Sequence, residues 1–297
     1  MDTPELIEWR NENPVDYIKG MNLLLETPVQ DISDTFMEIY KYTRLYIPNV
    51  LFKYFSLSDC IELNDMKIET LRNQLLHFAE IRTLNDPFDS KAFFYNPESL
   101  KSIKRLKKCN GRFIEDFSDF HRITSFTSCG TSSLPMWAHY SNNHQGYCIV
   151  YDMTDERNVR ILANTFPIQY TNVRVDLTVF MKSQVEKICA EIDSHISKGC
   201  QVISLSDPSM VFIPQLLSYI KNSTWSYEQE FRCSIGKVDK QTHVLPAFPK
   251  EIYIGLNCSE YYAERLTEIG RELGVPVYKM VFDDLDTVYD LRSERVE

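Results

Sequence analysis

The chain has 297 residues and a formal net charge of −10. This length suits one elaborated domain with a sizeable core, and the acidic balance argues against a general basic surface for nucleic acid, although it leaves room for a local basic groove. The acidic, polar start does not resemble a signal peptide, no apolar run reaches the roughly 20 residues of a membrane helix, and no cysteine pair has zinc-site spacing. We therefore expect a cytoplasmic protein that makes no membrane contact.

The first 50 residues are expected to form an N-terminal helical extension. Apolar side chains recur at helical spacing over residues 31–46, and acidic side chains crowd the start of that segment. Residues 51–297 are expected to form a single α+β domain of a catalytic type.

Short strands and helices are mixed through this second region. Strands are expected over 51–57, 75–81, 122–129, 146–153, 166–173, 223–235, 251–256 and 275–282, and helices over 68–75, 100–108, 134–143, 176–198, 208–222 and 259–273. The last two strands and the helix between them predict a β-α-β unit. Because the elements do not alternate steadily, the pattern favours an α+β fold over a doubly wound sheet.

Two glutamates, Glu228 and Glu230, stand one residue apart in the segment 223–235. If this segment is a strand, alternation places both of them and Arg232 on one face, with the carboxylates about 7 Å apart. One interpretation is a solvated face on which Arg232 balances Glu230. The other is a pair of carboxylates that points into a site.

Two segments upstream carry further candidates. In the expected strand 122–129, Ser125 and Thr127 share a face, and such hydroxyls can hold a ligand or orient a carboxylate, although an edge strand also tolerates them. The segment that follows gathers Trp137, His139 and Tyr140. Histidine can act as a general base, but a structural or capping role also explains His139.

The first strand and the polar turn after the second strand give weaker signals. Lys53 and Tyr54 lie on opposite faces of the expected strand 51–57, which is also the pattern of an ordinary amphipathic strand with a lysine that reaches solvent. Asp86 and Asp89 resemble part of a carboxylate ligand set, but a turn held by Asx hydrogen bonds explains them as well.

Taken together, these segments resemble a bacterial family known as domain of unknown function 2971 (DUF2971). The resemblance rests on LFKYFSL, LHFAEIRTLNDPFD, ITSFTS, MWAHYSNNHQGYCIVYD and WSYEQEFR, and it covers roughly residues 50–285. A polar anchor on the first strand, hydroxyls on a later strand and a late E-x-E motif are similar to the layout of ADP-ribosyltransferases. That similarity implies a mixed, split β-sheet core with flanking helices, and an enzyme that transfers ADP-ribose from NAD, as a toxin or an anti-phage defence effector.

The resemblance also implies roles for particular residues. Lys53 or Tyr54 would hold NAD, Ser125 or Thr127 would support the nicotinamide ribose, and Glu230, assisted by Glu228, would stabilise an oxocarbenium-like transition state. The implied catalytic residues are Ser125, Glu228 and Glu230, and the implied cofactor-binding residues are Lys53, Tyr54, Thr127, Trp137, His139, Tyr140 and Arg232. Aromatic members of this set would stack on nicotinamide or adenine, and Arg72, Arg82 and Arg232 would pair with the diphosphate.

Other functions stay open beside this one. The acceptor of ADP-ribose would be a protein, a nucleic acid or a small molecule, and the aromatic helix from Phe36 to Tyr46 would suit a dimer contact. A metal-dependent nuclease or hydrolase could use Asp86, Asp89, His139 and Glu230. A non-catalytic module that senses a nucleotide or binds a protein is the third possibility.

Overall fold

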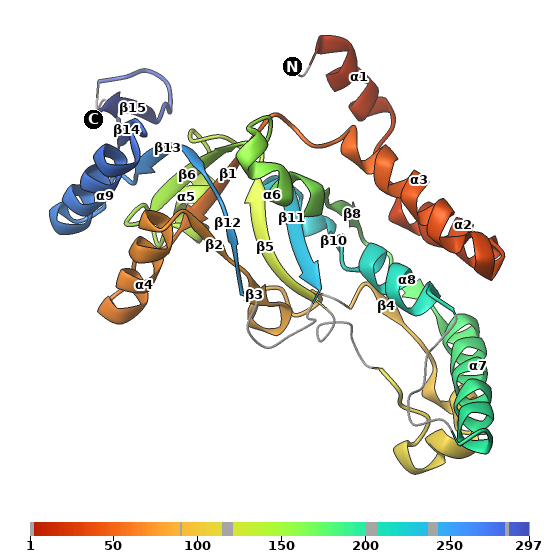
Figure 1. Ribbon diagram of the computed structural model, residues 1–297. Coiled ribbons are helices and arrows are strands. Elements are labelled where there is room, and N and C mark those ends of the chain that lie inside the picture. The colour runs from red at the N-terminus through yellow and green to blue at the C-terminus, as the bar shows by residue number, and fades with distance from the viewer. Residues whose placement is uncertain are drawn as a thin grey trace.

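The computed structural model describes residues 3–89, 91–114, 121–199, 207–236, 243–282 and 285–296. In this part of the chain a nine-stranded mixed sheet lies at the centre, and helices flank it on both sides (Figure 1). Its strands are β1 (Val50–Phe55), β3 (Ala79–Glu80), β5 (His121–Thr127), β6 (Tyr147–Asp152), β7 (Thr165–Pro167), β11 (Glu230–Gly236), β13 (Pro249–Ile254), β14 (Val277–Val281) and β15 (Arg292–Arg295). The strand order is β15-β14-β13-β6-β1-β5-β11-β7, with β3 paired to β5. The predicted α+β class is confirmed.

Three short sheets and a set of helices complete the described fold. The short sheets pair β2 (Leu75–His77) with β12 (Val244–Pro246), β8 (Gln169–Thr171) with β10 (Ile220–Asn222), and β4 (Phe93–Phe94) with β9 (Val175–Asp176). The α-helices are α1 (Pro4–Glu12), α2 (Tyr17–Glu26), α3 (Ile32–Arg44), α4 (Ile61–Arg72), α5 (Leu134–Tyr140), α6 (Val159–Asn164), α7 (Thr178–Ser197), α8 (Ser209–Leu217) and α9 (Glu260–Leu273). As predicted, β13, α9 and β14 form a β-α-β unit with parallel strands. None of the described helices is long and apolar enough to cross a membrane.

The central strand β1 joins two well-paired parts of the sheet. β1 pairs with β6 at six successive positions, from Val50 to Phe55, and β5 pairs with β11 at seven. Between β1 and β5, by contrast, the described register has one pair, Phe52 with Thr127. The two strands therefore separate beyond that pair, and their side chains border the opening between them.

Three apolar clusters hold the described fold together, and two of them are large. One lies where α4 and α9 pack against the sheet, through residues such as Ile68 and Leu266. The other joins the N-terminal helices to α7 and α8, and contains Tyr17 and Leu217. Figure 1 shows α2 and α3 running alongside α8. The predicted N-terminal helices thus share a core with residues from the middle of the chain.

The segment 223–235 differs from its prediction as one continuous strand. Its first half is a 3-10 helix, η6 (Ser223–Glu228), which begins where the Asn222 side chain accepts a hydrogen bond from the Thr224 N–H. Gln229 then adopts a left-handed conformation with φ of 44°, and β11 starts at Glu230. Glu228 is therefore not a strand residue, and strand alternation was the wrong basis for relating the two carboxylates.

Two predicted helices differ as well. The basic segment 100–108 lies in short 3-10 helices, Pro97–Leu100 and Lys104–Cys109, and not in an α-helix. The helix expected over 208–222 ends as α8 at Leu217, and β10 takes up its last three residues.

Candidate functional site

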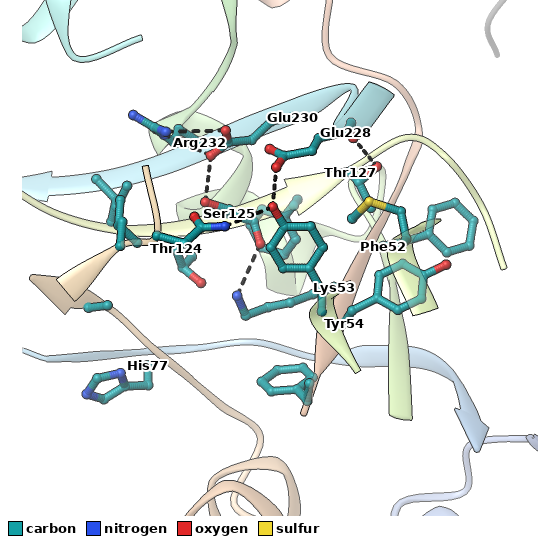
Figure 2. Close-up of a pocket in the computed structure, with 18 of the residues that line it drawn as sticks. Phe52, Lys53, Tyr54, His77, Thr124, Ser125, Thr127, Glu228, Glu230 and Arg232 are labelled. Carbon is teal, nitrogen blue, oxygen red and sulfur yellow. Dashed lines mark hydrogen bonds and ion pairs between the residues drawn. The ribbon is translucent and has the colours of Figure 1, made fainter. Parts of the chain in front are cut away.

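A cavity of about 400 Å³ opens where β1 and β5 separate (Figure 2). Side chains from β1, β5, α4, α5, β11 and the turn before residue 90 line it. Its volume lies in the range of small-molecule sites, most of which are clefts with a few well-placed polar groups. Eight of the ten predicted site residues border this cavity, namely Lys53, Tyr54, Ser125, Thr127, Tyr140, Glu228, Glu230 and Arg232.

The other two predicted residues, Trp137 and His139, are not among the lining residues. The Trp137 side chain is fully buried in an apolar cluster, packs edge-on against Tyr54, and donates its indole N–H to the Thr131 carbonyl at 2.7 Å. His139 is exposed and lies beside the Tyr227 ring. Neither side chain therefore lines the cavity at which Trp137 was predicted to stack and His139 to bind the cofactor.

Glu230 is held by three neighbouring side chains. Its Oε1 accepts hydrogen bonds from the Ser125 hydroxyl at 2.6 Å and from Arg232 Nε at 2.8 Å, and its Oε2 accepts from Lys221 Nζ at 2.9 Å and Arg232 Nη2 at 3.2 Å. Burial alone would raise the pKa of Glu230, but Arg232 and Lys221 outweigh it and lower the pKa to about 2. Glu230 is thus a buried carboxylate that stays ionised.

Glu228 lies beside Glu230 with fewer partners. Its Oε1 accepts a hydrogen bond from the Tyr140 hydroxyl and its Oε2 accepts one from Lys221 Nζ at 2.6 Å. Burial raises the pKa of Glu228, with Glu230 adding to that effect against the attraction of Lys221. Both glutamate side chains are 5% exposed or less, which excludes the interpretation of E-x-E as a solvated face.

Two of the predicted polar residues, Arg232 and Thr127, stabilise the positions of the two glutamates. Arg232 donates to Glu230, to Asp89 Oδ1 at 2.6 Å and to the Ser218 carbonyl at 2.8 Å, so it acts as an internal counter-ion of two buried carboxylates. The Thr127 hydroxyl donates to the Glu228 carbonyl at 2.5 Å and so fixes the turn that precedes β11.

The predicted diphosphate partners Arg72 and Arg82 do not line the cavity either. Arg72 forms ion pairs with Glu69, Glu268 and Glu272 between α4 and α9.

Lys53 reaches across the opening from β1 to β5, as Figure 2 shows. Its ammonium group donates to the Ser125 carbonyl at 3.1 Å and lies 5.3 Å from the centre of the Phe55 ring. Burial lowers the pKa of Lys53 to about 8, against the attraction of Glu230. The Lys53 side chain therefore bridges β1 and β5 in the region where the two strands are not paired.

Sequence reasoning missed Lys221 and Tyr170. Lys221 bridges the two glutamates, and the Tyr170 hydroxyl oxygen accepts the Glu230 backbone N–H at 2.8 Å. Lys221 stands in the short strand β10, in a segment predicted as the end of a helix, and nothing in its sequence context signals a buried ion pair.

A metal site receives no support from the geometry. Among the described residues, no group of three or more histidine, cysteine, aspartate and glutamate side chains is suited to hold a metal ion. Of the four residues considered for a metal-dependent nuclease, Asp89 and Glu230 line the cavity, and both pair with Arg232.

Comparison with known proteins finds a family model that matches part of the chain. Residues 136–233 match a family model described as "Protein of unknown function (DUF2971)". The predicted resemblance to DUF2971 is confirmed over this stretch, which is shorter than the predicted span of roughly residues 50–285. The DUF2971 match runs from α5 into β11 and includes Tyr140, Lys221, Glu228, Glu230 and Arg232. No curated protein and no solved structure matched the chain significantly.

Proposed function

We propose that this protein is an ADP-ribosyltransferase-like enzyme that takes NAD as its donor. The observation that carries the proposal is the meeting of Lys53, Ser125 and Glu230, from β1, β5 and β11, at one cavity. These residues stand in three segments far apart in the sequence, and the resemblance assigns each of them to the NAD site. The separation of β1 from β5 also fits the split sheet that the resemblance implies.

The carboxylates suit the chemistry of this reaction. Loss of nicotinamide develops positive charge on the ribose, and a fixed carboxylate beside that charge lowers the barrier by several kcal/mol in a water-poor site. Glu230 already accepts four hydrogen bonds, whereas each oxygen of Glu228 accepts one. In this proposal Glu228 accepts a hydrogen bond from a ribose hydroxyl, and Glu230 holds the side chains of Lys221 and Ser125 in place.

A non-catalytic module that binds a nucleotide is the second candidate. The donors around both glutamates favour it, because Lys221 offsets the charge of Glu228, and Arg232 and Lys221 offset the charge of Glu230, so less negative charge is left for a transition state. Both candidates use the same cavity. They differ in whether bound NAD is cleaved, and a role as toxin or anti-phage effector belongs to the first candidate alone.

Release of nicotinamide from labelled NAD, with and without cell lysate as a source of acceptor, tests the proposal. We expect release by the wild type and a loss of about 100-fold or more in Glu228→Gln. Glu186→Gln is the matched control, because Glu186 is exposed on α7. Binding of NAD without release would favour the second candidate, and absence of both would refute both.

A further inference from the structure

One wall of the cavity carries two lysines and a histidine from three different elements. Lys53 comes from β1, Lys67 from α4 and His77 from β2, and all three line the cavity. The glutamates belong to other elements, η6 and β11.

The two lysines on this wall differ from the other cations of the site in their partners. Lys221 and Arg232 both contact carboxylates. Lys53 donates to the Ser125 carbonyl, and Lys67 donates to the carbonyl and hydroxyl of Ser56 at 2.6 and 3.1 Å. In the described ranges no carboxylate forms an ion pair with either lysine. Both ammonium groups therefore donate to neutral oxygens, and the carboxylate of Glu230 attracts Lys53 without a direct ion pair.

Burial lowers the pKa of all three groups, and for Lys53 and His77 a neighbouring cation lowers it further. Burial lowers the pKa of Lys67, and the pKa of Lys53 is lowered by burial and further by Lys67. The pKa of His77 is lowered by burial and then by the charges of Lys53 and Arg122. Cations that lower a neighbour's pKa, as Lys67 does for Lys53 and Lys53 does for His77, mark a place where an anion would be stabilised.

The surroundings of this wall suit the rest of a ligand. Phe55, Leu63 and Met66 give it apolar surface. Thr124 adjoins Ser125 on β5 and lines the same cavity, and its buried hydroxyl has no hydrogen-bond partner among the described residues. A buried hydroxyl without a partner is costly, and an oxygen atom of a ligand would supply one.

We propose that Lys53, Lys67, His77 and the Thr124 hydroxyl form a subsite for the phosphate groups of a phosphorylated small molecule. Two ammonium groups, an imidazole and a hydroxyl offer several donors to the oxygens of a di-anion, and lysine is a common phosphate ligand in proteins. The apolar side chains beside them would contact the organic part. The subsite rests on this wall alone and does not require ADP-ribose transfer. If the donor is NAD, its diphosphate belongs here.

Isothermal titration with pyrophosphate, ADP and adenosine tests the subsite. We expect pyrophosphate and ADP to bind the wild type and adenosine to bind at least tenfold more weakly than ADP. Lys53→Gln and Lys67→Gln should each weaken ADP binding by tenfold or more, and Lys67→Arg should keep most of it. The matched control is Lys182→Gln, an exposed lysine on α7.

A variant of the histidine adds a test that does not depend on the lysine variants. His77→Gln changes an exposed side chain, so it should weaken ADP binding without a change in melting temperature, even if a lysine variant fails to fold. The subsite is refuted if the wild type binds neither pyrophosphate nor ADP, if sulfate binds as tightly as pyrophosphate, or if the folded variants bind ADP like the wild type. Binding of ADP without release of nicotinamide from NAD would support the subsite and count against the enzyme.

Discussion

At the scale of single residues, the two glutamates of E-x-E have different surroundings despite standing two positions apart. Replacing Glu230 with Gln removes the charge that faces Arg232 and Lys221 in a buried network, and breaking such a network typically costs about 3–5 kcal/mol. Glu228→Gln removes one contact with Lys221 and should cost less. Urea unfolding of both variants measures the difference. Equal stability of Glu230→Gln and the wild type would contradict the network.

The lowered pKa of Glu230 predicts a loss of stability in acid. The pKa of Glu230 is lowered to about 2 in the folded protein, and the ordinary value is 4.5. Its contribution to stability is therefore fully present above pH 4.5 and is lost as the pH falls toward 2, with a size of roughly 3 kcal/mol. The stability advantage of the wild type over Glu230→Gln should shrink across this range. An advantage that stays constant from pH 5 to pH 2.5 would refute the lowered pKa.

The lowered pKa of Lys53 predicts a change in stability at alkaline pH. Its pKa is lowered by burial to about 8 in the folded protein, from an ordinary value of 10.5, so the folded state releases the proton before the unfolded chain does. Wild-type stability should therefore rise relative to Lys53→Met between pH 8 and pH 10.5, by up to roughly 3 kcal/mol. Urea unfolding of both proteins at pH 7.5 and pH 10 measures the change. A difference that does not grow with pH would show that Lys53 keeps its ordinary pKa.

At the scale of elements, the sequence predicts most helices and strands but not the contacts between them. Hydrophobic spacing alone places α3, β5, β6 and α9 close to their observed bounds. The segment 223–235 fails because a left-handed Gln229 interrupts it, and no residue pattern announces that turn. Lys221 and Tyr170 could not be assigned to the site, since their roles depend on which strand lies next to β11. Pairing between distant segments is a property of the folded sheet.

Gly146, immediately before β6, allows a test of how closely β1 and β6 approach each other. A Cβ atom added to Gly146 would lie 1.8 Å from the Phe55 carbonyl oxygen, so β1 and β6 could not keep their present separation at the end nearest the cavity. We expect Gly146→Ala to lower the free energy of unfolding by about 2 kcal/mol or more. Gly20→Ala in α2 is the control, because its nearest neighbour is a side chain at 3.4 Å and alanine favours a helix. A Gly146→Ala protein as stable as Gly20→Ala would mean that the two strands do not meet so closely.

At the scale of the whole molecule, the N-terminal helices belong to the core that supports the cavity. Tyr17 in α2 is 1% exposed, its hydroxyl donates to the Pro167 carbonyl at 2.8 Å, and Phe36 in α3 stacks on Phe212 of α8 with ring centroids 4.2 Å apart. The Pro167 carbonyl lies in β7, which pairs with β11, and β11 carries Glu230 and Arg232. A continuous path of packed elements therefore links the helices of the first 50 residues to the site, and removal of the expected N-terminal helical extension tests how far the site depends on it.

A chain that begins at residue 49 removes these helices. It would expose the apolar surface of α8 and the residues that Tyr17 and Phe36 cover, so we expect loss of cooperative unfolding and of ligand binding together.

A milder change probes the same contact, since Met21 is 2% exposed and Met21→Ala should lower the free energy of unfolding by about 2–5 kcal/mol. Met37→Ala is its control, because Met37 is 45% exposed on α3 and should change stability by less than about 0.5 kcal/mol. Thermal unfolding followed by near-ultraviolet circular dichroism distinguishes the outcomes. A shortened chain that melts cooperatively at the wild-type temperature would show that the first 50 residues are an appendage, and the cavity would then depend on the sheet and its remaining helices alone.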